Sequence, residues 1–167
     1  SEADAREGLR KVIAGAKGRV AVTCFASNVA RIDSIIKAAQ MNDRSVAIVG
    51  RALNRAISAA REVGYLQDLP DLVPESDIEL VPREHLVVIC TGTQGEPRAA
   101  MARIAAGSHE SVSLDPDDTG IYSSRQIPGN ENAINRVQDM LLRRKINLVT
   151  DDDARVHVSG HPARDEM

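Results

Sequence analysis

The spacing of apolar positions along the chain alternates between helical periods and short continuous runs. The opening stretch "SEADAREGLRKVIAGAKG" is typical of an amphipathic helix that Ser1 caps and that ends near Gly15 or Gly18. The run "RVAVTCF" is apolar, β-branched and of strand length. In "SNVARIDSIIKAAQMN", behind a Ser27 or Asn28 cap, apolar residues recur at helical spacing: Val29, Ile32, Ile35, Ile36 and Ala39.

The middle of the chain repeats this order. "SVAIVG" predicts a second buried strand, and "LNRAISAAREVGYL" a helix that ends at Gly64. The Pro- and acid-rich segment "QDLPDLVPESDIELVPREH" predicts a loop with one short helical turn. A third strand, "LVVICT", leads into "GTQGEP" and a helix from about Arg98 to Ala106.

The last third predicts shorter strands. "SVSL" and "GIYSS" are expected to form a pair of strands around the acidic turn "DPDD". "IPGNENAINRVQDMLLRRK" supplies a Pro-Gly turn, an Asn130 cap and an amphipathic helix. "INLVT" and "RVHVSG" are expected to be the closing strands, separated by "DDD".

Apolar strands that alternate with helices predict an α/β fold with a mostly parallel sheet flanked by helices. No internal repeat or linker divides the sequence, so we expect a single domain over residues 1–167. The chain starts at Ser1 and stops within "ARDEM", which resembles the first turn of a helix. We therefore expect this domain to be a piece of a larger protein.

Composition and charge narrow the kinds of function. The chain has 167 residues, 43% hydrophobic and 27% charged, as in ordinary globular proteins. A net charge of −3 argues against nucleic-acid binding by bulk positive charge, so phosphate recognition must be local. Too few aromatic residues are present for a base-stacking platform: Phe25, Tyr65 and Tyr122.

Cellular location is also constrained by the sequence. No apolar run is long enough to span a membrane, and no secretion leader is evident. Cys24 and Cys90 each lie in an apolar strand-like run, as reduced buried thiols commonly do. We expect a cytoplasmic protein with no membrane partner.

Three expected loops at strand ends are small and polar: "FASN", "GTQGEP" and "SGH". Ligands of parallel sheets meet the loops at the carboxyl ends of strands, and backbone N–H groups and hydroxyls there suit a phosphate. Turns and caps use the same residue types, so each loop alone is ambiguous. A Walker loop and a GxGxxG motif are both absent, which argues against nucleotide hydrolysis and dinucleotide binding.

His157 and His161 stand four residues apart in "VHVSGHPARDEM". On a helix this spacing would put two imidazoles on one face, but the flanking valines and Gly160 favour a strand that ends in a turn. The two histidines are either a pair that serves the fold, or a site for phosphate binding or proton transfer beside a metal held elsewhere.

No other residues complete a metal site in the sequence. Cys24 and Cys90 are far apart, and His85 and His109 are expected to be solvated. We expect neither a metal site nor a cofactor within these 167 residues.

Five segments occur from one end of the chain to the other: "VTCFASNVARI", "VAIVGRAL", "TGTQGEPRAAMARIA", "IYSSRQIPGNENAINRV" and "VHVSGHPARDEM". Together they resemble the β-CASP domain of the ribonuclease J family in its bacterial form. The patterns TG-T/S-QGEP, SS-x-x-IPGNE and HVSGH are specific in this combination.

The resemblance implies a function. In that family the β-CASP domain is inserted into a metallo-β-lactamase domain, whose HxHxDH motif and further ligands hold two zinc ions. None of those ligands is present here, so the segment alone is expected to be inactive. The parent is implied to cleave single-stranded RNA internally and from the 5′ end, in rRNA processing and mRNA decay, as a homo-oligomer (dimer or tetramer).

The resemblance also implies roles for particular residues. His161 is implied to be catalytic and closest to the scissile phosphate. Substrate contacts are implied for the whole HVSGH segment: His157, Val158, Ser159, Gly160 and His161. The "FAS" loop, with His157 and Ser159, is implied to line a pocket for the 5′-monophosphate of RNA: Phe25, Ala26 and Ser27. Hydroxyls, turn N–H groups and an imidazole can bind a terminal phosphate without a polycationic surface.

The alternative is a non-enzymatic α/β module that binds a small phosphorylated ligand in the same loops. HxHxDH upstream of this segment, with a PVHGE-like motif downstream, would favour the nuclease.

Overall fold

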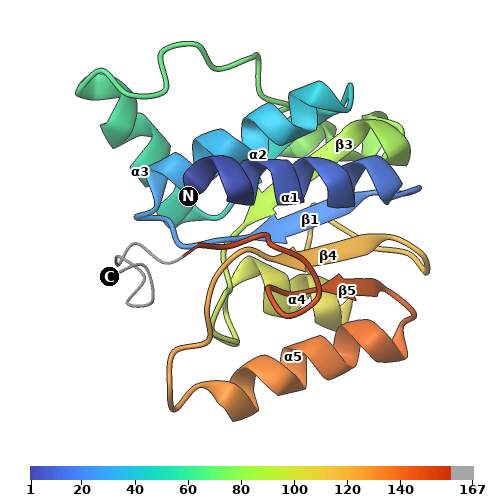
Figure 1. Cartoon of the computed structure of the whole chain (residues 1–167). Coiled ribbons are helices and arrows are strands. Elements are labelled where there is room, and N and C mark those ends of the chain that lie inside the picture. Colours follow the sequence, from blue (N-terminus) through green and yellow to red (C-terminus); the bar gives the residue numbers. More distant parts are fainter. Residues whose placement is uncertain (159–167) are drawn as a thin grey trace.

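The computed structural model describes residues 1–158 and has one five-stranded sheet at its centre (Figure 1). Every neighbouring pair of strands is parallel, and the order across the sheet is β2-β3-β1-β4-β5. The strands are β1 (Val20–Thr23), β2 (Ser45–Val49), β3 (Leu86–Cys90), β4 (Thr119–Tyr122) and β5 (Asn147–Val149). The predicted parallel α/β fold is confirmed.

Helices cover both faces of the sheet. In Figure 1, three lie above it and two below: α1 (Glu2–Gly15), α2 (Val29–Met41) and α3 (Arg51–Glu62), then α4 (Ala100–Ala106) and α5 (Glu131–Arg143). Side chains of β1 alternate between the two cores, Val20 and Val22 toward α1–α3 and Ala21 toward α4 and α5. Burial on both faces explains why the strands are continuous apolar runs.

The predicted helix starts are largely confirmed. Ser1 and Asp4 form a reciprocal capping box at the start of α1. Asn28, rather than Ser27, caps α2, and its Oδ1 accepts from the backbone N–H of Arg31 at 3.0 Å. The long connection before β3 contains two 3₁₀ helices where one turn was expected, η1 (Glu75–Leu80) and η2 (Arg83–His85).

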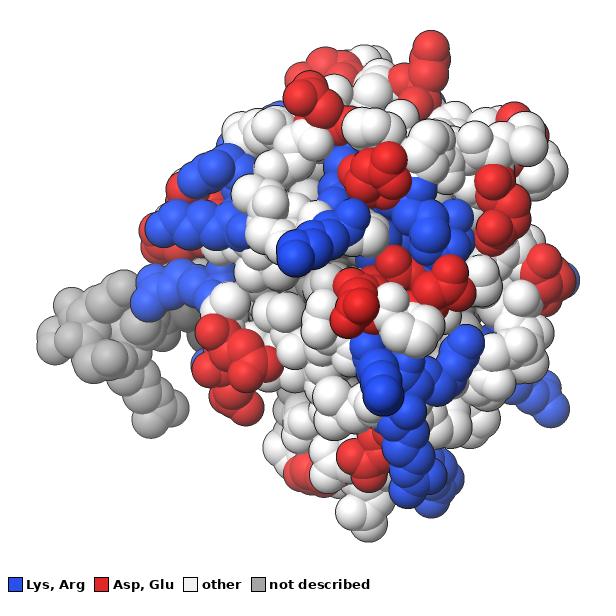
Figure 2. Space-filling view, turned by 90° about the vertical axis from the view of Figure 1, so that its right-hand side faces the viewer, with Lys and Arg blue, Asp and Glu red and all other residues white. Residues whose placement is uncertain are grey.

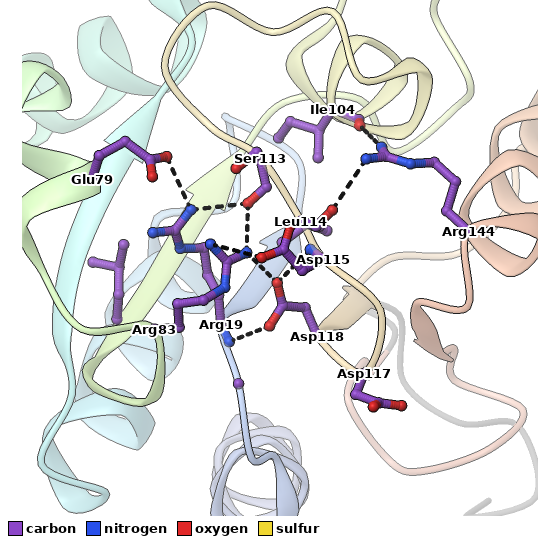
Figure 3. Close-up of polar contacts among 12 residues, drawn as sticks. Arg19, Glu79, Arg83, Ile104, Ser113, Leu114, Asp115, Asp117, Asp118 and Arg144 are labelled. Carbon is purple, nitrogen blue, oxygen red and sulfur yellow. Dashed lines mark hydrogen bonds and ion pairs between the residues drawn. The ribbon is translucent and has the colours of Figure 1, made fainter.

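The prediction of a strand at "SVSL" is wrong. Residues 111–114 are irregular, and only the following segment forms a strand, β4. Side chains of arginines take the place of a partner strand (Figure 3). Arg19 and Arg83 each donate to the carbonyl of Ser113 at 2.9 Å, and Arg144 donates to the carbonyl of Leu114 at 3.2 Å.

The prediction of a strand at "RVHVSG" is also wrong over its described part, because residues 155–158 pair with no strand there. The Ser123 hydroxyl donates to the carbonyl of Val156, and Val156 itself is fully buried. Side-chain contacts therefore hold this segment against the sheet. Residues 159–160, which complete the predicted strand, lie outside the described residues.

The surface has mixed charge on the side that Figure 2 presents, where Lys and Arg side chains are interleaved with Asp and Glu side chains. Over residues 1–158, no helix has the length and apolar character needed to cross a membrane.

Candidate functional site

The candidate site lies at the carboxyl edge of the sheet. Because the strands are all parallel, the loops that follow them open at this one edge. β1 leads into the "FASN" loop, β3 into "GTQGEP", β4 into "SSRQ" and β5 into "TDDD".

The "FAS" residues form a tight turn at the start of α2. The backbone N–H of Asn28 donates to the carbonyl of Phe25 at 3.0 Å, which closes the turn. Phe25 and Ala26 are half-buried, whereas Ser27 is exposed. The turn thus serves the fold through Asn28 and leaves the hydroxyl of Ser27 at the surface.

The "GTQGEP" loop connects to the loop after β4. The side chain of Gln94, 7% exposed, donates to the carbonyl of Arg125 at 2.9 Å and accepts from the N–H of Ile127 at 2.8 Å. Gly95, at a φ of 75°, lies so close to the first turn of α5 that an added Cβ would be 2.4 Å from the carbonyl oxygen of Ala133. These groups therefore order the neighbouring loop and are not available to an anion.

Arg31 is the residue that sequence reasoning missed. It lies in the first turn of α2 with 0% exposure, although its position in the sequence is that of an ordinary charged helix residue. Its Nε donates to Glu2 at 3.0 Å and its Nη1 to the Ser123 hydroxyl at 3.0 Å. The same guanidinium contacts three successive residues of the C-terminal segment: Val156, His157 and Val158.

His157 is held at this edge by two contacts. Its backbone N–H donates to Asp151 at 3.2 Å, and its Nδ1 is 2.8 Å from Nη1 of Arg31. A guanidinium can only donate, so Nδ1 accepts and the proton of the neutral ring is on Nε2. Partial burial, followed by the charge of Arg31, lowers the pKa of His157 below its ordinary value, and Asp151 opposes this shift.

The other predicted site residues divide into two groups. Val158 is described, and its carbonyl accepts from Arg31 at 3.5 Å. Ser159, Gly160 and His161 lie outside the described residues. The structure thus brings the first half of HVSGH to the helix that follows the "FAS" loop, with Arg31 as the link.

A polar pocket of about 560 Å³ opens beside this segment. Its walls come from the loops after β3, β4 and β5 and from α5: Thr93, Tyr122, Ser124, Arg125, Gln126, Asn135, Gln138, Thr150, Asp151 and Asp152. Asp151 also accepts from the N–H of His157, so the pocket and the histidine segment share a wall. Amides and hydroxyls predominate, with one cation and two carboxylates.

The described residues do not fit a two-zinc centre. Within residues 1–158, one group of three ligand atoms comes within 4.8 Å: Glu75, His109 and Glu110. Each of these groups already has a hydrogen-bond partner. Nδ1 of His109 accepts from the backbone N–H of Ser111 at 3.0 Å, and the carboxylate of Glu75 accepts from the Ser111 hydroxyl. The carboxylate of Glu110 accepts from the guanidinium of Arg103. His109 is half-buried rather than solvated as predicted, whereas His85 is exposed.

Both cysteines are buried and free, as the sequence predicted. Burial raises the pKa of Cys24 to about 12, and it also raises that of Cys90. Neither thiol is therefore activated for nucleophilic chemistry.

The fold and this edge define the chain as a parallel α/β domain whose polar loops gather where strands end. A family model described as "Ribonuclease J, beta-CASP domain" matches residues 17–141. The chain belongs to this family, as the resemblance of its motifs predicted.

Curated relatives agree with this assignment. Ribonuclease J of Sinorhizobium meliloti is 45% identical over 167 residues, which are 100% of this chain and 30% of that protein. Ribonuclease J of Mycolicibacterium smegmatis is 46% identical over 168 residues, which cover 100% of this chain and 30% of that protein. Ribonuclease J of Thermus thermophilus is 37% identical over 167 residues, which cover 100% of this chain and 29% of that protein. The chain thus spans less than a third of the length of these relatives.

Proposed function

We propose that this chain is the RNA-clamping domain of a zinc-dependent ribonuclease of the J type. The observation that carries the proposal is the position of His157, which a buried arginine holds at the carboxyl edge, next to the helix that the "FAS" loop begins. Membership of the family supports it, and so does the name of the relatives. RNA processing and decay in the cytoplasm would be the setting, with cleavage both internal and from the 5′ end.

The catalytic metals would be held by another part of the parent. Residues 1–158 offer no free set of converging ligands, so the zinc ions would belong to a metallo-β-lactamase domain of the same chain. Residues 1–167 would form one β-CASP domain of a homo-oligomeric parent, a dimer or tetramer. This segment alone would then be inactive.

A 5′-monophosphate site would combine the "FAS" loop with the histidine segment. Ser27 offers an exposed hydroxyl, and His157 offers an N–H on Nε2. We assign the remaining positions to the same site: Phe25, Ala26, Val158, Ser159 and Gly160. Such neutral donors suit a chain of net charge −3, because a terminal phosphate can be bound by a few directed hydrogen bonds.

The polar pocket would hold an uncharged part of the RNA. Asp151 and Asp152 in its wall would repel a backbone phosphate, whereas Asn135 and Gln138 can pair with the edge of a base. A base or ribose next to the bound 5′-phosphate therefore suits this pocket best.

The similarity to ribonuclease J proteins gives no support to the alternative, a non-catalytic module that binds a small phosphorylated ligand. It would not require the end-to-end relation to ribonucleases that this chain has.

The experiment that tests the proposal uses the full-length protein. We assign His161 to the scissile phosphate, where negative charge would develop during cleavage. Loss of a group that stabilises such charge costs about 10²–10³ in rate. We expect His161→Ala to slow cleavage of every RNA by this factor, whatever its 5′ end, with zinc content unchanged by elemental analysis.

Ser159→Met is the matched variant. It would fill the 5′-phosphate pocket, so we expect it to slow 5′-to-3′ degradation far more than internal cutting and to abolish the preference for monophosphate over triphosphate ends. Parallel loss of both activities in the two variants, or an intact end preference in Ser159→Met, would contradict the roles assigned here. A turn that serves only the fold predicts instead lowered stability and equal loss of all activities.

A further inference from the structure

The buried guanidinium of Arg31 has hydrogen-bond partners beyond the carboxylate of Glu2 that balances its charge. Burial of a guanidinium is costly unless its N–H groups are satisfied, and Glu2 alone accepts from two of its nitrogens, at 3.0 and 3.2 Å. The third nitrogen, Nη1, points toward the end of β4 and the C-terminal segment. Its shortest contact, 2.8 Å, is with Nδ1 of His157.

This contact determines which nitrogen of His157 can carry a proton. Arginine stays protonated in proteins and has no acceptor, so Nδ1 must keep its lone pair toward Nη1. Rotation of the ring would leave Nη1 without this acceptor. The carbonyls of Val156 and Val158, which accept from the same guanidinium, fix the backbone on both sides of the ring.

Arg31 also belongs to the first turn of α2. Its backbone N–H is bonded to Asn28, directly after the "FAS" loop. One residue therefore connects both halves of the proposed 5′-phosphate site, although it is itself inaccessible to RNA.

We infer that Arg31 is a positioning residue for the 5′-phosphate site: it holds the ring of His157 in one orientation, with Nδ1 occupied and Nε2–H left to donate to the phosphate. This inference rests on the proposed function. It adds a residue that never touches the substrate but decides how well the 5′ end is recognised.

The test is a double-mutant cycle in the full-length protein. The measured quantity is the ratio of kcat/KM for 5′-monophosphorylated RNA to kcat/KM for the same RNA with a 5′-triphosphate. We expect Arg31→Gln to lower this ratio on the order of tenfold, the loss that one hydrogen bond to a charged group produces. If Arg31 acts through His157, the double variant Arg31→Gln/His157→Ala will be no worse than His157→Ala alone.

Two controls separate positioning from stability. Glu2→Gln removes the ion-pair partner of Arg31 but leaves its contact with His157, so it should lower the melting temperature and leave the ratio unchanged. Arg55→Gln makes the same chemical change at an exposed position of α3 and should alter neither. If Arg31→Gln fails to fold, Arg31→Met combined with Glu2→Gln leaves no unpaired charge in the core and should show the same loss of preference.

A pH profile supplies a readout that a purely structural role would not move. The charged groups that face His157 are Arg31 from α2, Asp151 after β5, Arg125 after β4 and Glu2 from α1. Burial would still lower the pKa of His157, but loss of the positive charge of Arg31 should raise this pKa relative to that of the unaltered protein. The inflection that His157→Ala removes from the profile should therefore shift to higher pH in Arg31→Gln.

The outcomes distinguish the inference from the proposed function. If His157→Ala leaves the monophosphate preference intact, the proposed phosphate site is wrong and the inference fails with it. If His157→Ala lowers the preference and the double variant lowers it further by the full factor of Arg31→Gln, the phosphate site stands and the positioning role is overturned. The same holds if Glu2→Gln lowers the preference as much as Arg31→Gln does.

Discussion

At the residue scale, a glycine in α1 determines how closely the C-terminal segment can approach the helix. A Cβ added to Gly8 would lie 1.8 Å from the carbonyl oxygen of Arg155, whereas one added to Gly15 would meet nothing within 4 Å. Two residues further on is His157, so space at Gly8 is needed for the segment that carries the candidate site. Helix propensity alone would favour alanine at both positions by about 1 kcal/mol.

We therefore expect Gly8→Ala to displace residues 155–158, since the clash is with backbone and cannot be relieved by a side-chain rotation. Hydrogen–deuterium exchange should show faster exchange in this segment. Gly15→Ala is the matched control in the same helix and should leave the exchange unchanged while stabilising the chain by up to about 1 kcal/mol. Equal behaviour of the two variants would contradict this account.

At the element scale, residues 111–118 show how side chains can replace a strand partner. Asp118, 3% exposed, accepts from the N–H of Arg19 at 2.8 Å and of Asp115 at 2.7 Å, and it pairs with Arg83 (Figure 3). This carboxylate joins the irregular segment to the start of β1 and to η2. The segment is therefore ordered by buried polar contacts and not by a ladder of backbone hydrogen bonds.

Asp118→Ala should consequently be costly. It leaves two backbone N–H groups without their acceptor and removes the buried carboxylate partner of Arg83, which keeps the Ser113 carbonyl. We therefore expect a loss of about 3 kcal/mol in the free energy of unfolding, measured by urea denaturation. Asp115→Ala removes a more exposed carboxylate that contacts the same arginine at 3.5 Å, and it should change stability by less than about 1 kcal/mol. Similar losses for both would mean that the buried contacts are not what holds the segment.

At the scale of the whole molecule, the two cores share one sheet. Adjacent residues of β1 and β3 point alternately into the core under α1–α3 and the core under α4 and α5, so neither core can form without the strands that build the other. Such coupling predicts a single cooperative unit.

We expect the 167-residue chain to unfold in one transition without the rest of its parent. Calorimetry should give equal calorimetric and van't Hoff enthalpies, and circular dichroism and tyrosine fluorescence should report the same midpoint. A broad transition, or midpoints that differ between probes, would show that the core depends on residues beyond this chain.

The sequence by itself determined the sheet and its helices. Short, β-branched apolar runs such as "LVVIC", which alternate with helical segments, predict strands buried on both faces, and the 3.6-residue spacing from Val29 to Ala39 predicts a helix with one buried side. Both patterns involve residues close together in the sequence, so they can be recognised without knowledge of the fold. Family motifs then indicated where RNA chemistry would lie, through residues that physical reasoning alone left ambiguous.

Only the tertiary structure decided which polar residues serve the fold and which face outward. Arg31 and Asp118 look like surface charges in the sequence, yet both are buried, because their partners come from segments far away in the chain. The same contacts overturned the strands predicted at "SVSL" and over residues 155–158, where β-branched and apolar residues suggested a ladder. Hydrogen bonds between charged side chains and backbone groups far away in the sequence produce no periodic pattern of residue types. They can therefore be recognised only in the folded chain.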